Sequence, residues 1–225
     1  MPRPPKLDVL YEDNHLLVVN KPAGLPTQGV VEGTASVVTL AKAYLKQKYK
    51  KPGNVYLGVV SRLDASTSGV LVLARTSKSA ARLAEQFRYR ETEKTYWALV
   101  ELPPQPSAGE LAHWVLKNDR KLRMEVVPPR TRGAVHAKLT YQTLRTEQHA
   151  ALIEVRLHTG RKHQIRLQLA TIGCPILGDT KYGSRAKFAG PGIALHAARL
   201  AIEHPTTKAR LEFRAPPPKV WRLSA

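Results

Sequence analysis

The chain has 225 residues, enough for one large domain or two small ones, and its hydrophobic fraction of 43% allows a buried core. No apolar run approaches the roughly 20 residues that cross a membrane, so we expect no membrane-spanning segment and no partner within a membrane. Cys174 is the only cysteine, which excludes an internal disulfide and a cysteine-rich zinc site. We expect a reducing, cytoplasmic compartment and no signal peptide, because residues 1–6 contain no apolar segment.

The charge is strongly unbalanced. Lysine and arginine total 36 and aspartate and glutamate total 17, for a formal net charge of +19. Such an excess indicates a polyanionic partner, with nucleic acid as the first choice and an anionic membrane surface as the alternative. Because the basic residues are spread along the whole chain, a broad basic surface is favoured over a basic tail.

The first third of the chain alternates short apolar runs with loops. Residues 7–11 and 15–20 are predicted strands separated by a turn at 12–14. Residues 20–29 form a proline- and glycine-rich loop that contains Lys21. Helical spacing of apolar side chains predicts a helix over about 35–49.

Two apolar runs, VV and VLVLA, flank a polar centre within residues 59–74. The runs are typical of buried strands, and the centre contains one carboxylate, Asp64, two residues from Arg62. A carboxylate held between core strands beside a cation that favours its ionised form could act as a nucleophile or a base. The alternative is an Arg–Asp pair that only closes a loop, and these residues alone favour that alternative.

A predicted helix over 77–89, with Ser77 as its N-cap, is followed by a predicted strand over 93–100 that contains Tyr96. By itself Tyr96 is an ordinary core aromatic residue. Residues 108–149 predict strands interrupted by basic loops, and residues 150–158 predict a further strand.

A helix is predicted from about residue 161 to residue 172, capped by Thr159 and with Ile165 on its buried face. Its N-terminus, beside Arg161 and Lys162, would suit an RNA phosphate. His163 alone would suggest a metal ligand, but no second suitably spaced ligand accompanies it, and we expect no metal.

Six segments together resemble the RluA-type RNA pseudouridine synthases. Residues 61–69 resemble the family's H-R-L-D-x-x-T-S-G, with Ser61 in place of histidine, and residues 160–166 resemble G-R-T-H-Q-I-R, with Lys162 in place of threonine. The others are N-K-P-A-G-L-P at 20–26, K-x-Y at 94–96, G-D-x-x-Y-G at 178–183 and L-H-A-x-x-L at 195–200. The resemblance covers essentially the whole chain, so we expect a single catalytic domain over 1–225 with no S4-type RNA-binding domain before it.

The resemblance implies an α+β fold: a mixed, largely antiparallel central sheet with flanking helices and a basic active-site cleft. It implies isomerisation of specific uridines in structured RNA, rRNA or tRNA, by a monomer without a cofactor. Asp64 would be the nucleophile, attacking either C1′ or the uracil ring, with Arg166 as its basic partner and Tyr96 against the target base. The substrate-binding residues would be Arg62, Arg161, His163, Leu195 and Lys21.

Some alternatives stay open. Arg62 could fill the gap left by an extruded base, since a guanidinium both stacks and binds phosphate. Lys21 could contact RNA or be a solvated loop lysine. The chain could also be a catalytically inactive RNA-binding or RNA-folding protein of the same fold. An unrelated hydrolase with an aspartyl nucleophile would need a second acid or base near Asp64.

Overall fold

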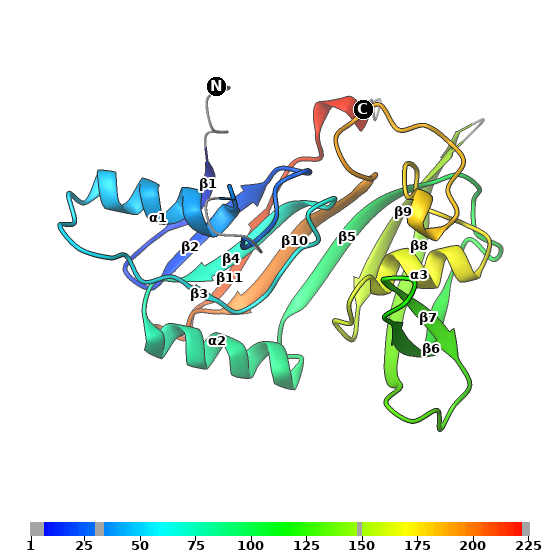
Figure 1. Cartoon of the computed structure of the whole chain (residues 1–225), viewed down its shortest axis with the longest axis horizontal. Coiled ribbons are helices and arrows are strands. Elements are labelled where there is room, and N and C mark those ends of the chain that lie inside the picture. The colour runs from blue at the N-terminus through cyan, green and yellow to red at the C-terminus, as the bar shows by residue number, and fades with distance from the viewer. Residues whose placement is uncertain (1–6, 30–33, 148–149, 222–225) are drawn as a thin grey trace. The chain divides into compact units, whose positions relative to one another are not determined.

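The computed structural model describes residues 7–29, 34–147 and 150–221 (Figure 1). The chain forms two compact units, each with its own buried core. Unit 1 comprises Met1–Glu93 and Ala197–Pro218, and unit 2 comprises Lys94–His196 and Lys219–Ala225. The predicted absence of a signal peptide concerns residues outside the described part of the chain. No helix in the described ranges is long and apolar enough to cross a membrane.

The strands of unit 1 are mostly joined in antiparallel pairs. β1 pairs with β2, β2 with β4, β3 with β4, and β10 with β11. Their bounds are β1 (Asp8–Glu12), β2 (Leu16–Lys21), β3 (Gly58–Val59), β4 (Ser68–Ala74), β10 (Leu195–Glu203) and β11 (Arg210–Arg214). β10 belongs to this unit from Ala197 onward.

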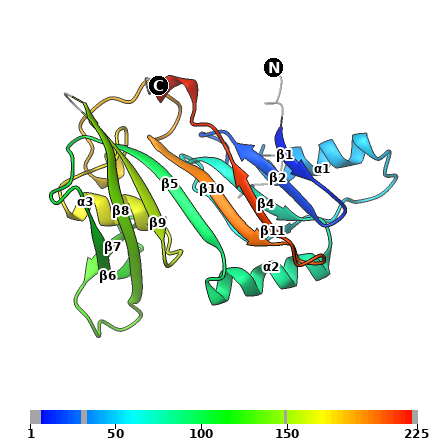
Figure 2. The ribbon, with the colours of Figure 1, turned by 180° about the vertical axis from the view of Figure 1, so that it is seen from behind.

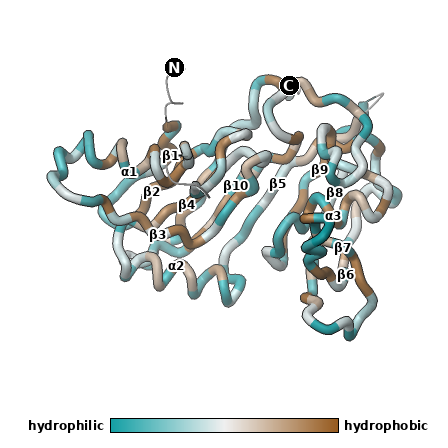
Figure 3. Tube along the Cα trace, in the orientation of Figure 1, coloured by the Kyte–Doolittle hydropathy of each residue, from teal (hydrophilic) through white to brown (hydrophobic). Residues whose placement is uncertain are grey.

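β2 is buried on both of its faces, which explains its unbroken apolar sequence. Leu17 and Val19 pack against α1 (Val37–Lys48), whereas Leu16 and Val18 lie in a second cluster that includes Leu83 of α2 (Ser77–Tyr89). Alternate side chains of a strand point to opposite faces, so one strand serves both clusters. β2 and β4 are accordingly hydrophobic along most of their length (Figure 3).

The helices of unit 1 begin at hydroxyl caps. Ser36 and Thr39 form a capping box, in which Thr39 N donates to Ser36 Oγ and Ser36 N donates to Thr39 Oγ1. α2 begins one residue earlier than predicted: Thr76, not Ser77, is the N-cap and accepts the bond from Ser79 N. Thr76 has the extended backbone that an N-cap needs, so Ser77 becomes the first helical residue.

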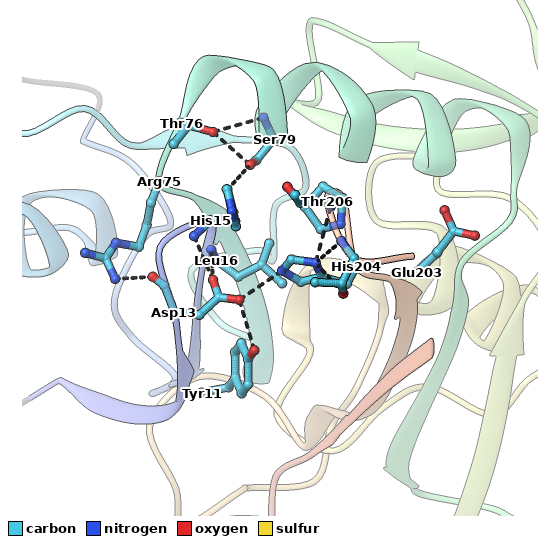
Figure 4. Close-up of polar contacts among 12 residues, drawn as sticks. Tyr11, Asp13, His15, Leu16, Arg75, Thr76, Ser79, Glu203, His204 and Thr206 are labelled. Atoms are coloured by element: carbon cyan, nitrogen blue, oxygen red, sulfur yellow. Dashed lines mark hydrogen bonds and ion pairs between the residues drawn. The ribbon is translucent and has the colours of Figure 1, made fainter. Parts of the chain in front are cut away.

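Asp13 joins the turn between β1 and β2 to the turn between β10 and β11 (Figure 4). One carboxylate oxygen accepts bonds from the backbone nitrogens of His15 and Leu16, both at 2.7 Å. The other lies 2.9 Å from His204 Nε2 and accepts a bond from the Tyr11 hydroxyl. Burial opposes ionisation of Asp13, but these hydrogen bonds outweigh it and lower the pKa of the carboxyl.

Within unit 2 the sheet strands are antiparallel neighbours in the order β5-β9-β8-β6-β7. The strands are β5 (Glu93–Val100), β6 (Ala108–Asn118), β7 (Arg123–Val127), β8 (Val135–Glu147) and β9 (Ala150–Leu157). α3 (Gln164–Thr171) covers one face of β8 and β9, lying in front of them in Figure 1 and behind them in Figure 2. Two short 3-10 helices follow, η1 (Thr180–Tyr182) and η2 (Lys219–Trp221).

α3 starts later than the sequence predicts. Its N-cap position is His163, in the left-handed region at φ 52°, and Thr159 does not cap it. The Thr159 hydroxyl instead donates to Gln164 Oε1 at 2.7 Å and accepts a bond from Lys138 N at 2.8 Å. The tight turn at 160–163 therefore delays the helix, while Ile165 still enters the core as predicted.

The predicted fold class is confirmed: a large, mixed and mostly antiparallel sheet with flanking helices. The basic cleft stays a prediction.

Candidate active site

In unit 1, Asp64 lies in the segment between β3 and β4 and begins a tight turn. Thr67 N donates to Asp64 O at 3.0 Å, and Thr67 itself is buried. Leu63 is fastened from both sides by Thr27, whose hydroxyl donates to Leu63 O at 2.8 Å and accepts from Leu63 N at 3.2 Å. The backbone next to Asp64 is therefore held by the 20–29 loop.

Gly69 follows this turn at the start of β4, and only glycine fits there. Its φ is +112°, and a Cβ at this position would lie 2.3 Å from the carbonyl oxygen of Ala197. Both the backbone conformation and this close approach exclude a side chain. The T-S-G part of the motif thus lets β4 begin directly beside β10.

Lys21 is fully buried. Its ammonium donates to Pro22 O at 2.9 Å, to Leu25 O at 2.7 Å and to Ala65 O at 3.2 Å, so it ties its own loop to the Asp64 turn. Burial lowers the pKa of Lys21 to about 8, and the negative charge of Asp64 opposes this shift. Of the two alternatives for Lys21, its burial excludes a solvated loop lysine and does not favour direct contact with RNA.

Replacing Lys21 by methionine is expected to lower the free energy of unfolding at neutral pH by about 2–4 kcal/mol. The reason is that three carbonyl oxygens lose their charged donor. The pKa of about 8 in the folded protein, against an ordinary value of 10.5, adds a pH dependence. Between these values the unfolded chain binds more protons, so wild type gains stability over Lys21→Met as pH rises, by up to about 3 kcal/mol.

Urea unfolding of both proteins, at neutral pH and on the alkaline side of this window, measures the effect. Lys42→Met on the exposed face of α1 is the matched control. A stability difference that stays constant with pH would contradict the assignment of a depressed pKa to Lys21.

In unit 2, Arg166 lies in the first turn of α3 and is held by Asp179. Arg166 Nε lies 2.7 Å from Asp179 Oδ2, and Nη2 lies 2.8 Å from Oδ1. Both side chains are buried, with 8% and 1% of their surface exposed. The family resemblance implied that Asp64 is the carboxylate partner of Arg166. A bond between Arg166 and Asp179 was not predicted.

His163 contacts the same turn through Tyr182. His163 Nδ1 lies 2.9 Å from the Tyr182 hydroxyl, which also accepts a bond from Met124 N at 3.0 Å. The Tyr182 ring lies against Arg166, with 5.1 Å between the ring centre and the guanidinium carbon. Two predicted site residues, His163 and Arg166, therefore meet at one tyrosine.

Tyr96 and Leu195 also share a neighbourhood in unit 2. Tyr96, on β5, is half-buried and packs against the apolar cluster that contains Leu195, which is buried.

The two predicted substrate-binding arginines lie in different units. Arg161, in unit 2, donates from Nε to His136 O at 2.9 Å, and its side chain is partly exposed. Arg62 lies in unit 1 and is exposed. The predicted residues are thus distributed over both units, with Asp64, Arg62 and Lys21 in unit 1.

Asp179 and Tyr182 are the residues to which the sequence assigned no role. Both lie in the G-D-x-x-Y-G segment, and the acidic residue of that motif was the available signal. Among the described residues, no three histidine, cysteine, aspartate or glutamate side chains are grouped as metal ligands.

The chain belongs to the RNA pseudouridylate synthase family, whose sequence model matches residues 15–171. Members of this family are isomerases that act on RNA. The expected family is thereby confirmed.

Individual relatives match nearly the whole chain. Ribosomal large subunit pseudouridine synthase D of Xylella fastidiosa is 36% identical over 97% of this chain and 68% of its own length. Dual-specificity RNA pseudouridine synthase RluA of Escherichia coli K12 is 34% identical, covering 96% of this chain and 95% of that protein. The solved structure of human RNA pseudouridylate synthase domain containing 4 superimposes with a TM-score of 0.78 at 29% identity, over 96% of this chain and 90% of that one.

Proposed function

We propose that this protein isomerises specific uridines of a structured RNA, rRNA or tRNA, with Asp64 as the nucleophile. The observation that supports it best is the fastening of the Asp64 turn by Lys21 and Thr27. A turn held in this way positions its carboxylate before substrate arrives, which lowers the entropic part of the barrier. The family match supplies the reaction class.

The reaction rearranges one nucleotide and needs no external reagent. The N1–C1′ bond breaks, the uracil turns, C5 bonds to C1′, and the C5 proton is lost while N1 regains one. No atoms other than protons are exchanged, so neither a cofactor nor a metal is required. Asp64 could attack C1′ or the uracil ring, and either route uses a carboxylate that is ionised at the start.

The other predicted residues have roles that fit their chemistry. Arg166 supplies the cation that keeps Asp64 ionised and oriented. Tyr96 stacks on the target base or accepts its proton. The target uridine leaves its stack to be reached, and Arg62, which is exposed, fills the vacated space.

The remaining contacts to substrate are assigned by position. Arg161 binds a phosphate beside the start of α3. Leu195 lines the base pocket, and His163 supports substrate binding from the turn before α3. Lys21 holds the Asp64 turn in place through its bond to Ala65 O.

RNA as the partner is supported by the net charge of +19, since counterion release on phosphate contact favours such a surface. One relative is named for the large ribosomal subunit, which fits rRNA as one of the two substrate classes that we propose, rRNA and tRNA. We place the protein in the cytoplasm as a monomer whose residues 1–225 act as one catalytic domain.

Pseudouridine mapping of total RNA from a deletion strain tests this function. We expect one or a few pseudouridines to be missing and to return when the purified protein is added to that RNA. The identity of the restored positions decides between rRNA and tRNA. RNA that binds tightly but gains no pseudouridine would instead show an inactive RNA-binding protein.

A further inference from the structure

The Arg166 guanidinium donates hydrogen bonds from two of its nitrogens to one carboxylate. That carboxylate belongs to Asp179, a buried residue directly before η1. The two parallel bonds, Nε to Oδ2 at 2.7 Å and Nη2 to Oδ1 at 2.8 Å, form the planar fork that only arginine makes with a carboxylate. The third nitrogen, Nη1, lies outside this pair of bonds. Its direction is therefore set once the fork is made.

The backbone that carries this carboxylate is held in a tight turn. Asp179 N donates to Ile176 O at 3.0 Å, while Asp179 O accepts from Tyr182 N at 3.0 Å and from Ser184 N at 3.1 Å. Gly178 precedes it at φ +79°, a conformation that allows the tight turn. The backbone of Asp179 therefore has little freedom to shift, which fixes the place from which its carboxylate meets Arg166.

Tyr182 closes the arrangement on the face of the guanidinium. The ring centre lies 5.1 Å from the guanidinium carbon, and the hydroxyl is fixed by His163 Nδ1 and Met124 N. A guanidinium bonded along one edge and stacked on one face has lost its rotational freedom.

An ion pair buried this deeply is a weak source of stability. Removing two charges from water is costly, and well-packed apolar residues of similar volume often stabilise a fold as well or better. The pair therefore suggests a purpose other than joining α3 to η1.

We propose that Asp179 is a positioning residue of the reaction, which acts by holding the Arg166 guanidinium in one orientation, with Tyr182 as the stacking support. This inference rests on the proposed function, in which Arg166 serves Asp64. Asp179 does not touch the reacting atoms. Its contribution is to fix the orientation of the Arg166 guanidinium before RNA binds.

The test is a double-mutant cycle on the single-turnover rate at saturating enzyme, with D179N, R166M and D179N/R166M. We expect D179N to slow the chemical step by about 10–100-fold, the scale of a displaced catalytic group. RNA affinity should stay within about threefold, because no binding group is removed. The double variant should be no slower than R166M alone, since Asp179 acts through Arg166.

The matched control is D119N, the same exchange at an exposed acid of unit 2 whose side chain is 75% accessible and pairs with Lys117. It should keep the wild-type rate. A second variant, D179E, keeps the charge and moves it by one methylene; it should fold if D179N does not, with a rate between those of wild type and R166M. Melting temperatures of all variants separate a loss of fold from a loss of rate.

The inference is overturned if folded D179N or D179E turns over at the wild-type rate while R166M is slow. It is equally overturned if the losses of D179N and R166M multiply in the double variant, because Asp179 would then act independently. If R166M itself keeps the wild-type rate while Asp64→Asn is inactive, the role proposed for Arg166 fails, and with it the part of the proposed function on which this inference depends.

Discussion

Asp64→Asn is expected to abolish pseudouridine formation while RNA binding stays within a few-fold of wild type. Asparagine has the shape of aspartate but cannot act as a carboxylate nucleophile. Removal of a nucleophile slows catalysis by about 10⁴-fold or more. The turn should persist, because the bonds that fasten it use backbone atoms of Leu63 and Ala65. Pseudouridine mapping of a substrate RNA, together with a binding titration of the same RNA, measures both quantities.

The matched control is Asp8→Asn, the same exchange at an exposed acid of unit 1 that accepts a bond from Asn20. It should keep wild-type turnover and affinity. Substantial pseudouridine formation by purified Asp64→Asn would sink the proposed mechanism. An equal loss of RNA binding would show that Asp64 acts in binding or folding instead.

Strands and helices with strong apolar patterns could be predicted from the sequence, because the burial of their side chains determines where they form. The run that became β2 is apolar at every position from Leu16 to Val19, and both of its faces are covered. The helical spacing at 35–49 gave α1 within two residues at its start. These features depend on neighbours in sequence, and a periodic pattern reports such neighbours well.

The start of α3 could not be predicted, because it depends on contacts from a distant strand. Thr159 has the chemistry of an N-cap, but its hydroxyl is used by Lys138 N of β8 and by Gln164. A capping preference describes only local bonds. Because β8 supplies a competing partner for Thr159, the helix begins at Gln164 and not at about residue 161 as predicted.

The motif around Asp64 could be predicted, but its supports could not. The sequence left Lys21 as either an RNA contact or a solvated loop lysine, because a proline- and glycine-rich sequence says nothing about which carbonyl oxygens converge on it. One of its three acceptors, Ala65 O, is 44 residues away along the chain. In the same way Asp179, 13 residues from Arg166, became its partner through a turn that the sequence only marked as a motif.

Arg166→Lys is expected to slow the chemical step by about 100-fold or more with only a modest loss of RNA affinity. Lysine keeps the positive charge but offers a single ammonium in place of the planar fork. It cannot make both bonds to Asp179, so the charge loses the orientation that the two short bonds impose. Single-turnover rates at saturating enzyme, compared with the dissociation constant for the same RNA, separate chemistry from binding.

The competing explanation is that Arg166 only binds an RNA phosphate. A phosphate accepts lysine nearly as well as arginine when charge is what matters, so in that case Arg166→Lys would keep its single-turnover rate and lose affinity instead. The burial of Arg166, with 8% of its side chain exposed, disfavours a phosphate contact, since a phosphate-binding arginine on a basic surface usually presents its guanidinium to solvent. A severe loss of rate at unchanged affinity would therefore identify Arg166 as part of the catalytic machinery, and a normal rate at reduced affinity would remove it from that machinery.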